Sequence, residues 1–166
     1  MNSLPADPQL ERDLIESKQL FRIVFEHSPA AITVTDKDER ITAWNAMAEK
    51  LLGMEKKDLF NKPVCDLYSP EEWKRMRGLN IRSKGMLSDI ATRVLRKDGT
   101  FLDVNASISV IKDAQGNIIG SIGILHDMTR EKMAEEQLRA SENKLRIILD
   151  NSAAAITMTN PRNTRP

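Results

Sequence analysis

The stretch Gly120-Ser121-Ile122-Gly123-Ile124-Leu125-His126-Asp127-Met128-Thr129-Arg130-Glu131-Lys132 decides how the rest of this sequence is interpreted. Its first half is apolar with interspersed glycines, which is typical of a strand inside a sheet. Charged and helix-favouring residues follow from Thr129 onward. The stretch therefore predicts a core strand that ends at Asp127 and continues, within three residues, as a long charged helix. Such a junction can pass a change in the core to a structure outside it.

Two further strands are predicted immediately before this one. From Ser88 the residues alternate with a period of two, and Lys97-Asp98-Gly99-Thr100 supplies a hairpin turn. Residues 101–110 form the next strand, and the Asp- and Gly-containing segment 113–117 turns the chain again. Three strands in series therefore form an antiparallel meander.

A hairpin and several short helices are predicted upstream of the meander. Residues 31–36 alternate between aliphatic and small or polar side chains, and 40–44 return as their partner strand. Asn45 occupies the position of a helix N-cap, and Gly53 can end that helix in a left-handed conformation. Ser69-Pro70 provides the cap and first turn of another helix.

Amphipathic helices are predicted on both sides of this core, over 10–27 and 130–151. In each helix the apolar or small residues recur at spacings of 4 and 3, which is an a/d stripe. Each stripe packs either on its own domain or against a second chain. We favour pairing between chains, in a homodimer formed through the flanking helices and the sheet. The dimer-helix residues are Leu14, Phe21, Leu138, Leu145 and Ile148.

The second helix begins a repeat of the first. Residues 22–35 and 146–159, which are related by a shift of 124 positions, are identical at eight of fourteen aligned positions. A repeated helix together with the strand that follows it is the mark of a repeated unit. We therefore expect one complete unit and the truncated start of a second.

Composition excludes several classes of protein. Only 4% of the 166 residues are aromatic and the net charge is +1, so neither stacking nor electrostatics predicts nucleic-acid binding. The single cysteine excludes an intrachain disulfide. The N-terminus resembles no signal peptide, and no run approaches about 20 apolar residues, so membrane insertion is not expected. We expect a cytoplasmic protein.

The order of these elements, and several short motifs within them, resemble the PAS domain with its C-terminal PAC segment. The last motif resembles the junction usually written Asp-Ile-Thr, with Met128 in the middle here. The motifs that carry the resemblance are His27-Ser28-Pro29, Asn151-Ser152, Ile41 to Asn45, Leu51-Leu52-Gly53, Lys97 to Thr100, Gly116 to Gly120 and Gly123 to Thr129.

The resemblance implies an α+β fold, namely a five-stranded antiparallel sheet with short helices over one face and amphipathic helices at either end. It implies a domain that senses a ligand, cofactor, redox state or light, or that mainly dimerises, and that stands in tandem ahead of a histidine kinase, cyclase or transcription-regulating output module. We favour a sensor that binds a small organic ligand between sheet and helices, in a tandem-PAS protein with a histidine kinase as output. The expected organisation is a disordered leader at 1–9, a helix at 10–27, the sensory domain at 28–129, a linker helix at 130–151, and a truncated second repeat or tail at 152–166.

Apolar residues provide a candidate lining for the ligand pocket, although they can equally fill a solid core. These residues are Ile32, Val34, Trp44, Leu59, Tyr68, Met76, Val94, Ile108, Ile122 and Ile124. The signal-relay junction is predicted at Asp127, Met128 and Thr129. A dimerisation scaffold with a filled core is the alternative function.

Haem- or flavin-dependent sensing is a second alternative, which the motifs disfavour. Cys65 lies where light-sensing relatives carry a reactive cysteine, but the flanking residues that hold flavin differ. The helical stretch 69–86 contains no histidine to ligate haem, and the two histidines are His27 and His126. No catalytic constellation is recognisable, so any enzymatic activity is expected in a downstream output domain.

Overall fold

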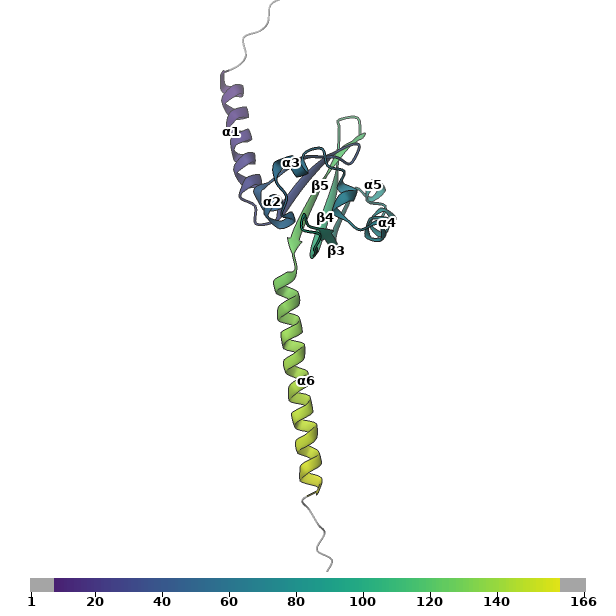
Figure 1. Ribbon diagram of the computed structural model, residues 1–166. Helices are drawn as coiled ribbons and strands as arrows, with labels where there is room; N and C mark the ends of the chain where they lie inside the picture. The colour runs from purple at the N-terminus through teal and green to yellow at the C-terminus, as the bar shows by residue number, and fades with distance from the viewer. Residues whose placement is uncertain (1–7, 159–166) are drawn as a thin grey trace, which may run out of the picture. The chain divides into compact units, whose positions relative to one another are not determined.

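The structure is a computed structural model that describes residues 8–158 (Figure 1). Its elements in chain order are α1 (Pro8–Glu26), β1 (Ala31–Asp36), β2 (Ile41–Trp44), α2 (Ala46–Leu52), α3 (Lys56–Leu59), the 3-10 helix η1 (Val64–Leu67), α4 (Pro70–Gly78), α5 (Ile81–Lys84), β3 (Met86–Leu95), β4 (Phe101–Lys112), β5 (Ile118–Asp127) and α6 (Thr129–Met158). The predicted hairpin, short helices, meander and flanking helices are confirmed. The first helix was predicted over 10–27 and begins two residues earlier.

The five strands form one antiparallel sheet in the order β2-β1-β5-β4-β3. The predicted α+β fold is therefore confirmed. Strand β5 lies in the middle of the sheet and pairs with β1 on one side and β4 on the other. The last strand is thus hydrogen-bonded on one edge to the first strand of the domain and on the other edge to the strand that precedes it in the sequence.

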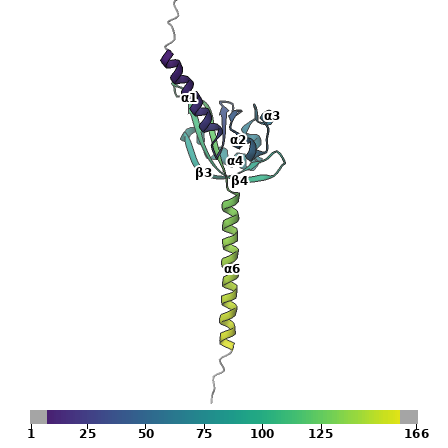
Figure 2. The ribbon, with the colours of Figure 1, turned by 90° about the vertical axis from the view of Figure 1, so that its left-hand side faces the viewer.

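The short helices α2 to α5 cover one face of the sheet, which we call the inner face (Figures 1 and 2). Side chains from this face and from the helices form the core. Its largest fully buried apolar members are Ile41, Leu52, Leu59, Leu67, Val94 and Val104. The alternation in β1 is clear, since Ala31, Thr33 and Thr35 are buried whereas the residues between them are only partly buried.

Asn45 connects three elements at one end of the sheet. The side chain is fully buried, and its Nδ2 donates to the carbonyl oxygens of Phe25 (3.0 Å) and Ala30 (2.9 Å). Its Oδ1 accepts from the backbone N–H groups of Ile32 and Ala48, both at 3.0 Å. The predicted helix cap is confirmed, and the same amide also anchors the end of α1 to the start of β1.

Two glycines bring β5 close to β1. A Cβ atom added to Gly120 would lie 2.1 Å from the backbone oxygen of Thr35, whereas one added to Gly123 would lie 3.1 Å from Oγ1 of Thr33. The first contact is with backbone and cannot be relieved by a side-chain rotation. A side chain at position 120 would therefore clash with the backbone, so glycine is required there. A side chain at position 123 would meet only the Thr33 side chain, which can adjust.

The chain divides after Asp127 into two compact units. The second unit consists of α6, which begins at Thr129 as predicted but continues to Met158, past the predicted end at 151. The repeat predicted a strand from position 155, yet residues up to Met158 are helical. The three alanines at 153–155 favour helix, and a strand there would need partner strands. Residues 1–7 of the predicted leader, and 159–166 of the predicted tail or second repeat, lie outside the described residues.

The apolar stripes of the flanking helices are exposed. In α1, Leu14 and Phe21 are more than half exposed, and in α6 so are Leu138, Leu145 and Ile148. Pairing between chains through these stripes stays a prediction. Between residues 8 and 158, no helix combines the length and apolarity required to cross a bilayer.

Candidate functional site

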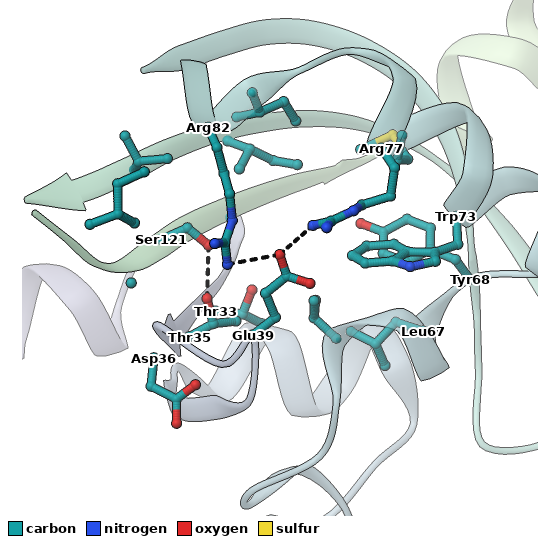
Figure 3. A pocket seen from close by; sticks show the side chains of 18 of the residues that line it. Thr33, Thr35, Asp36, Glu39, Leu67, Tyr68, Trp73, Arg77, Arg82 and Ser121 are labelled. Carbon is teal, nitrogen blue, oxygen red and sulfur yellow. Dashed lines mark hydrogen bonds and ion pairs between the residues drawn. The ribbon is translucent and has the colours of Figure 1, made fainter. Parts of the chain in front are cut away.

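A cavity of about 230 Å³ lies between the inner face of the sheet and the segment that contains η1, α4 and α5 (Figure 3). Strands β1, β4 and β5 and the turn between β1 and β2 supply the rest of its lining. The lining combines apolar, hydroxyl and charged side chains. These three groups occupy different parts of the wall.

The helical side of the cavity is apolar and aromatic. Leu67, Met76 and the rings of Tyr68 and Trp73 line it, with ring centroids 5.8 Å apart. Ile108 contributes from β4. Burial raises the pKa of Tyr68 to about 12, and the nearby carboxylate of Glu72 adds to the shift. The phenol therefore stays protonated at neutral pH and can only act as a hydrogen-bonding or packing group.

The part of the sheet wall formed by β1 and the middle of β5 is made of small and hydroxyl-bearing residues, whereas the sheet elsewhere adds the apolar side chains of Ile108, Val110, Ile118 and Leu125. Thr33 and Thr35 project from β1, while Ser121 and Gly123 come from the paired positions of β5. The hydroxyls of Thr35 and Ser121 lie 2.8 Å apart and hydrogen-bond to each other. The small size of these residues leaves the space that the cavity occupies, and the mutual hydrogen bond satisfies hydroxyls that would otherwise be costly to bury.

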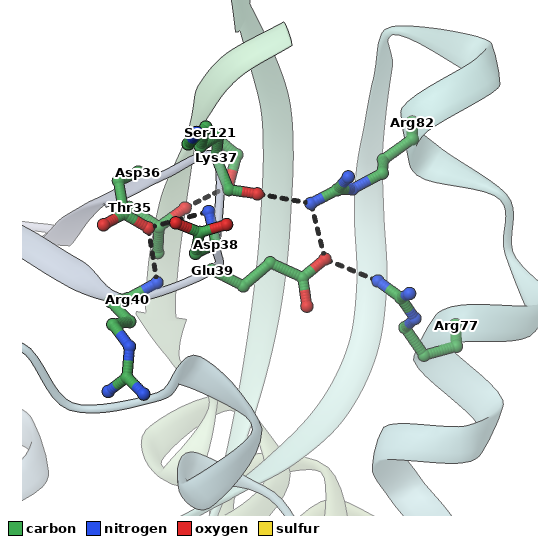
Figure 4. Close-up of polar contacts among 9 residues, drawn as sticks. All are labelled: Thr35, Asp36, Lys37, Asp38, Glu39, Arg40, Arg77, Arg82 and Ser121. Atoms are coloured by element: carbon green, nitrogen blue, oxygen red, sulfur yellow. Dashed lines mark hydrogen bonds and ion pairs between the residues drawn. The ribbon is translucent and has the colours of Figure 1, made fainter.

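Charged side chains meet at the rim of the cavity (Figures 3 and 4). Oε1 of Glu39 accepts from Nη1 of Arg77 at 2.5 Å and from Nη2 of Arg82 at 3.0 Å. Arg82 also donates to the carbonyl oxygen of Lys37, and the Arg77 guanidinium lies 5.6 Å from the centroid of the Trp73 ring. Glu39 thus joins the β1–β2 turn to both α4 and α5. Its backbone is left-handed, with φ of 62°, which is uncommon for a residue with a side chain.

A second polar cluster attaches α4 to β3. Glu72 accepts from Arg75 on its own helix and from the hydroxyl of Thr92, which is buried on the inner face of β3. These hydrogen bonds lower the pKa of Glu72 to about 2 despite its partial burial, and the bond from Arg75 has the largest effect. Arg75 also donates to the carbonyl oxygen of Ala91 at 2.6 Å. The cluster holds the helix that carries Trp73, Met76 and Arg77 in place over the sheet.

Comparison with known proteins identifies the fold family. A family model for the PAS fold matches residues 19–128, which is about two thirds of the chain. The chain belongs to the PAS family.

Two curated relatives of this PAS domain are sensor kinases. The sensor histidine kinase TmoS of Ectopseudomonas mendocina is 27% identical over 135 residues, which are 80% of this chain but 14% of that protein. The sensor protein kinase WalK of Staphylococcus aureus is 29% identical over 116 residues, which are 70% of this chain and 26% of that protein. The chain therefore spans about a quarter or less of the relatives' length.

Solved PAS structures share its architecture. A PAS domain from Colwellia psychrerythraea is 26% identical with a TM-score of 0.64, and the match covers 69% of this chain and 98% of that one. A PAS domain of an HTR-like protein from Haloarcula marismortui, at 19% identity and a TM-score of 0.55, covers 73% of this chain and 99% of that one. The second likeness concerns the fold alone.

Six of the ten residues predicted to line a pocket belong to the helical side or the core of the PAS domain. Tyr68, Met76 and Ile108 line the cavity. Leu59 and Val94 are fully buried elsewhere in the core, and Trp44 is half-buried, with its Nε1 donating to Glu49 at 2.8 Å. The structure therefore brings three of these six to the cavity.

The other four predicted pocket residues require a correction, because they lie on the opposite face of the sheet. Ile32 pairs with Ile124 and Val34 with Ile122, so the four form an apolar patch on the outer face. The buried neighbours Thr33 and Thr35 occupy the inner face instead. Alternation groups residues into two faces, but it does not say which group the helices cover. The expectation that the more apolar group of each strand faces the cavity is therefore wrong.

The charged rim was not predicted. Glu39 is separated by 38 positions from Arg77, and nothing in the sequence relates the β1–β2 turn to α4. The hydroxyl wall was also missed, although its signal was available. Thr33 and Thr35 share one parity of β1, and Ser121 and Gly123 share one parity of β5. When small and hydroxyl-bearing residues lie on the same side of two paired strands, that side is either a solvent-exposed face or the polar wall of a cavity.

The residues considered for cofactor binding lie away from the cavity. His27 and His126 are both exposed, and Cys65 is half-buried in η1, where burial raises the pKa of its thiol and Sγ donates to Asp66. None of these three lines the cavity, so the side chains present do not fit haem ligation or a flavin–cysteine adduct. Within residues 8–158, no His, Cys, Asp and Glu side chains group as a metal site would require.

The predicted junction lies where the strand meets the helix. Asp127 is the last residue of β5 and pairs with Val104, and Thr129 is the first residue of α6. Met128 alone separates the two elements, and its carbonyl oxygen accepts from the backbone N–H of Lys132 at 3.0 Å. The helix thus begins directly after the central strand of the sheet.

Proposed function

We propose that this PAS domain is a sensory module that binds a small organic ligand in the cavity and relays occupancy through β5 and α6. One observation carries the proposal. Gly120, Ser121, Gly123 and Leu125 of β5 line the cavity, and the same strand ends at Asp127 with a single residue before α6. A ligand that changes the packing of this strand acts directly on the base of the helix.

The sheet favours transmission along β5. Because β1 and β4 are hydrogen-bonded to its two edges, β5 is restrained laterally. A ligand that displaces the backbone at Ser121 or Gly123 therefore shifts the strand most easily along its length, toward its end. Switching requires an element with two arrangements whose balance the ligand shifts. In this proposal that element is a pair of α6 helices.

The second α6 helix comes from a second copy of the chain. The exposed a/d stripes of α1 and α6, which include Phe21 and Leu145, are long apolar surfaces of the kind that pair between helices. The outer-face patch of Ile32, Val34, Ile122 and Ile124 adds apolar surface from the sheet. A homodimer through helices and sheet covers both surfaces.

The output domain lies outside these residues. By likeness to the sensor histidine kinase TmoS and the sensor protein kinase WalK we expect it to be a kinase, and by likeness to TmoS a histidine kinase. We assign any catalytic activity to that domain, because the cavity presents packing, hydroxyl and ion-paired groups and lacks an arranged nucleophile and base. The cytoplasmic location expected from the sequence stays a prediction.

Native mass spectrometry of the purified chain tests ligand binding. We expect a bound small molecule, and a lower melting temperature after the molecule has been removed by unfolding and refolding. Val110→Phe fills the cavity, whereas Ile111→Phe places the same ring one residue along β4, off the cavity lining. Loss of the bound mass in the first variant alone supports the proposal.

An empty chain whose melting temperature is unchanged by Val110→Phe would favour the alternative of a dimerisation scaffold. For the helix pairing, Leu145→Glu should weaken dimerisation measured by light scattering. An unchanged dimer in Leu145→Glu and in Leu138→Glu would overturn that part of the proposal.

A further inference from the structure

The charges around the cavity are unevenly distributed. Its charged lining residues are Asp36, Glu39, Arg77 and Arg82. Asp36 is engaged by its own turn, because its Oδ1 accepts from the backbone N–H groups of Asp38 and Arg40, both at 2.9 Å (Figure 4). The remaining groups at the rim are one carboxylate and two guanidinium groups. The four formal charges of the lining sum to zero, and of its two carboxylates it is Glu39 that pairs with both guanidinium groups.

The two guanidinium groups converge on a single point. Arg77 comes from α4 and Arg82 from α5, and both donate to the same oxygen, Oε1 of Glu39. The guanidinium group is a rigid fork of five N–H donors that suits carboxylates in particular. Two forks aimed at one carboxylate oxygen form a receptor for a carboxylate, and Glu39 occupies it from within the chain.

Glu39 is poorly secured in this position. The side chains of Arg77 and Arg82 are 53% and 51% exposed, and ion pairs with such exposure contribute little to stability. A carboxylate that arrives with additional binding energy can therefore displace the Glu39 carboxylate.

The cavity supplies that additional energy. Next to the arginines lie the Trp73 and Tyr68 rings and the apolar side chains of Met76 and Ile81. A cavity of about 230 Å³ holds the volume of about eight liquid waters, which corresponds to an organic molecule of about eight to ten non-hydrogen atoms. The size and the wall chemistry fit a short apolar chain or a single ring.

We propose that the cavity is a site for a small organic monocarboxylate with an apolar body, whose carboxylate binds Arg77 and Arg82 in place of Glu39. This inference rests on the proposed function, since it names the class of ligand for the same cavity. Release of Glu39 would also break its ion pair with Arg77 of α4, while Arg82 of α5 can still donate to the carbonyl oxygen of Lys37 in the β1–β2 turn. Ligand binding and the ion pairs of Glu39 are thereby exclusive.

Matched acids and amides test the proposal on the whole 166-residue chain. The probes are hexanoate with hexanamide, and phenylacetate with phenylacetamide, measured by isothermal titration calorimetry at pH 7. Members of each pair have the same size and shape and differ in charge. We expect each acid to bind about tenfold tighter than its amide, because charge-assisted hydrogen bonds are about twice as strong as neutral ones.

Variants of the charged rim residues test whether these residues cause the difference in affinity between acid and amide. Arg77→Gln and Arg82→Gln should reduce acid affinity to that of the amide and leave the amide unchanged, while Arg77→Lys should give an intermediate affinity. Glu39→Gln should strengthen acid binding severalfold, because the internal competitor is lost. Lys74→Gln is the matched control, since it removes one positive charge from α4 away from the cavity lining. It should change neither the affinity for the acid nor the affinity for the amide. Circular dichroism verifies that each variant is folded.

The outcomes separate this inference from the proposed function. If acid and amide bind equally, or the amide binds better, the cavity is a ligand site but the carboxylate inference is overturned. If neither probe binds and Glu39→Gln does not alter this, the inference is also overturned, and the native mass spectrum alone then decides the proposed function.

Discussion

In β1 and β5, the face of the sheet that the helices cover carries the more polar side chains, and the opposite face carries the more apolar ones. Side-chain polarity alone suggests the reverse. At the paired positions in the middle of these strands, the inner-face residues, which the helices cover, are small or hydroxylated: Thr33, Thr35, Ser121 and Gly123. The outer-face residues are branched and apolar: Ile32, Val34, Ile122 and Ile124. Large apolar groups on the covered side would have filled the space that the cavity occupies. A domain that retains a cavity places its bulky residues where a second surface can cover them.

The largest expected effect comes from the closest approach between β5 and β1. Gly120→Ala should reduce the free energy of unfolding by about 3 kcal/mol or more, because the new Cβ would meet the Thr35 backbone oxygen at 2.1 Å. Gly123→Ala is the matched control on the same strand. Its Cβ meets only the Thr33 hydroxyl, so a loss of about 1 kcal/mol or less is expected. Urea denaturation of both variants measures the difference, and equal losses would contradict this picture of the two contacts.

Glu72 of α4, which accepts a hydrogen bond from Thr92 on the inner face, should make the attachment of α4 dependent on pH. The folded-state pKa of Glu72 is lowered from 4.5 to about 2, so its stabilisation is complete above about pH 5 and is lost as the pH falls toward 2. Because Arg75 is partly exposed, we expect Glu72→Gln to cost about 1 to 2 kcal/mol at pH 7. The wild-type and variant stabilities should converge between about pH 5 and 2. Denaturant titrations across this range measure the convergence, and a constant gap would contradict it.

The hydroxyl pair on the inner face should behave as a unit. Thr35→Val and Ser121→Ala each leave one hydroxyl without its partner at 2.8 Å, so each should cost about 1 kcal/mol. The double variant should cost less than the sum of the two, with a coupling of about 0.5 to 1 kcal/mol. Additive losses in the complete cycle would show that the two hydroxyls are solvated independently.

The smallest effect on stability is expected on the outer face. Ile122→Thr alters a partly exposed side chain, so the stability of the isolated domain should change by about 1 kcal/mol or less. If a second copy covers this patch, the dimer dissociation constant measured by sedimentation should rise severalfold. Thr33→Ser on the inner face is the control, and it should leave dimerisation unchanged. Equal dissociation constants for wild type and Ile122→Thr would remove the sheet from the proposed interface.

Local patterns in the sequence were sufficient to predict the elements of the fold. Asn45 and Gly53 cap α2 as predicted, and the Asp98-Gly99 turn joins β3 to β4. The strand-to-helix change at Asp127 is also where it was expected. Each of these features depends on residues a few positions apart, and short-range geometry determines them.

The cavity depends on long-range geometry and was only partly predicted. Of the expected pocket residues, Tyr68, Met76 and Ile108 line the cavity, because large side chains on helices and on the meander face a common core. Ile122 and Ile124 were misplaced because burial by α4 and α5, not hydrophobicity, selects the inner face. The convergence of Arg77 and Arg82 on Glu39 depends on how two helices lie over a distant turn. No local pattern encodes such a meeting point.

The single residue between β5 and α6 has a mechanical consequence. With 30 residues, α6 is about 45 Å long at 1.5 Å per residue, and in the proposed relay it would act as a lever with its pivot at Met128. Over that length a tilt of about 10° at the pivot displaces the far end by about 8 Å. If α6 relays ligand occupancy as proposed, a change of about 10° in its direction is enough to move its far end by most of a helix diameter.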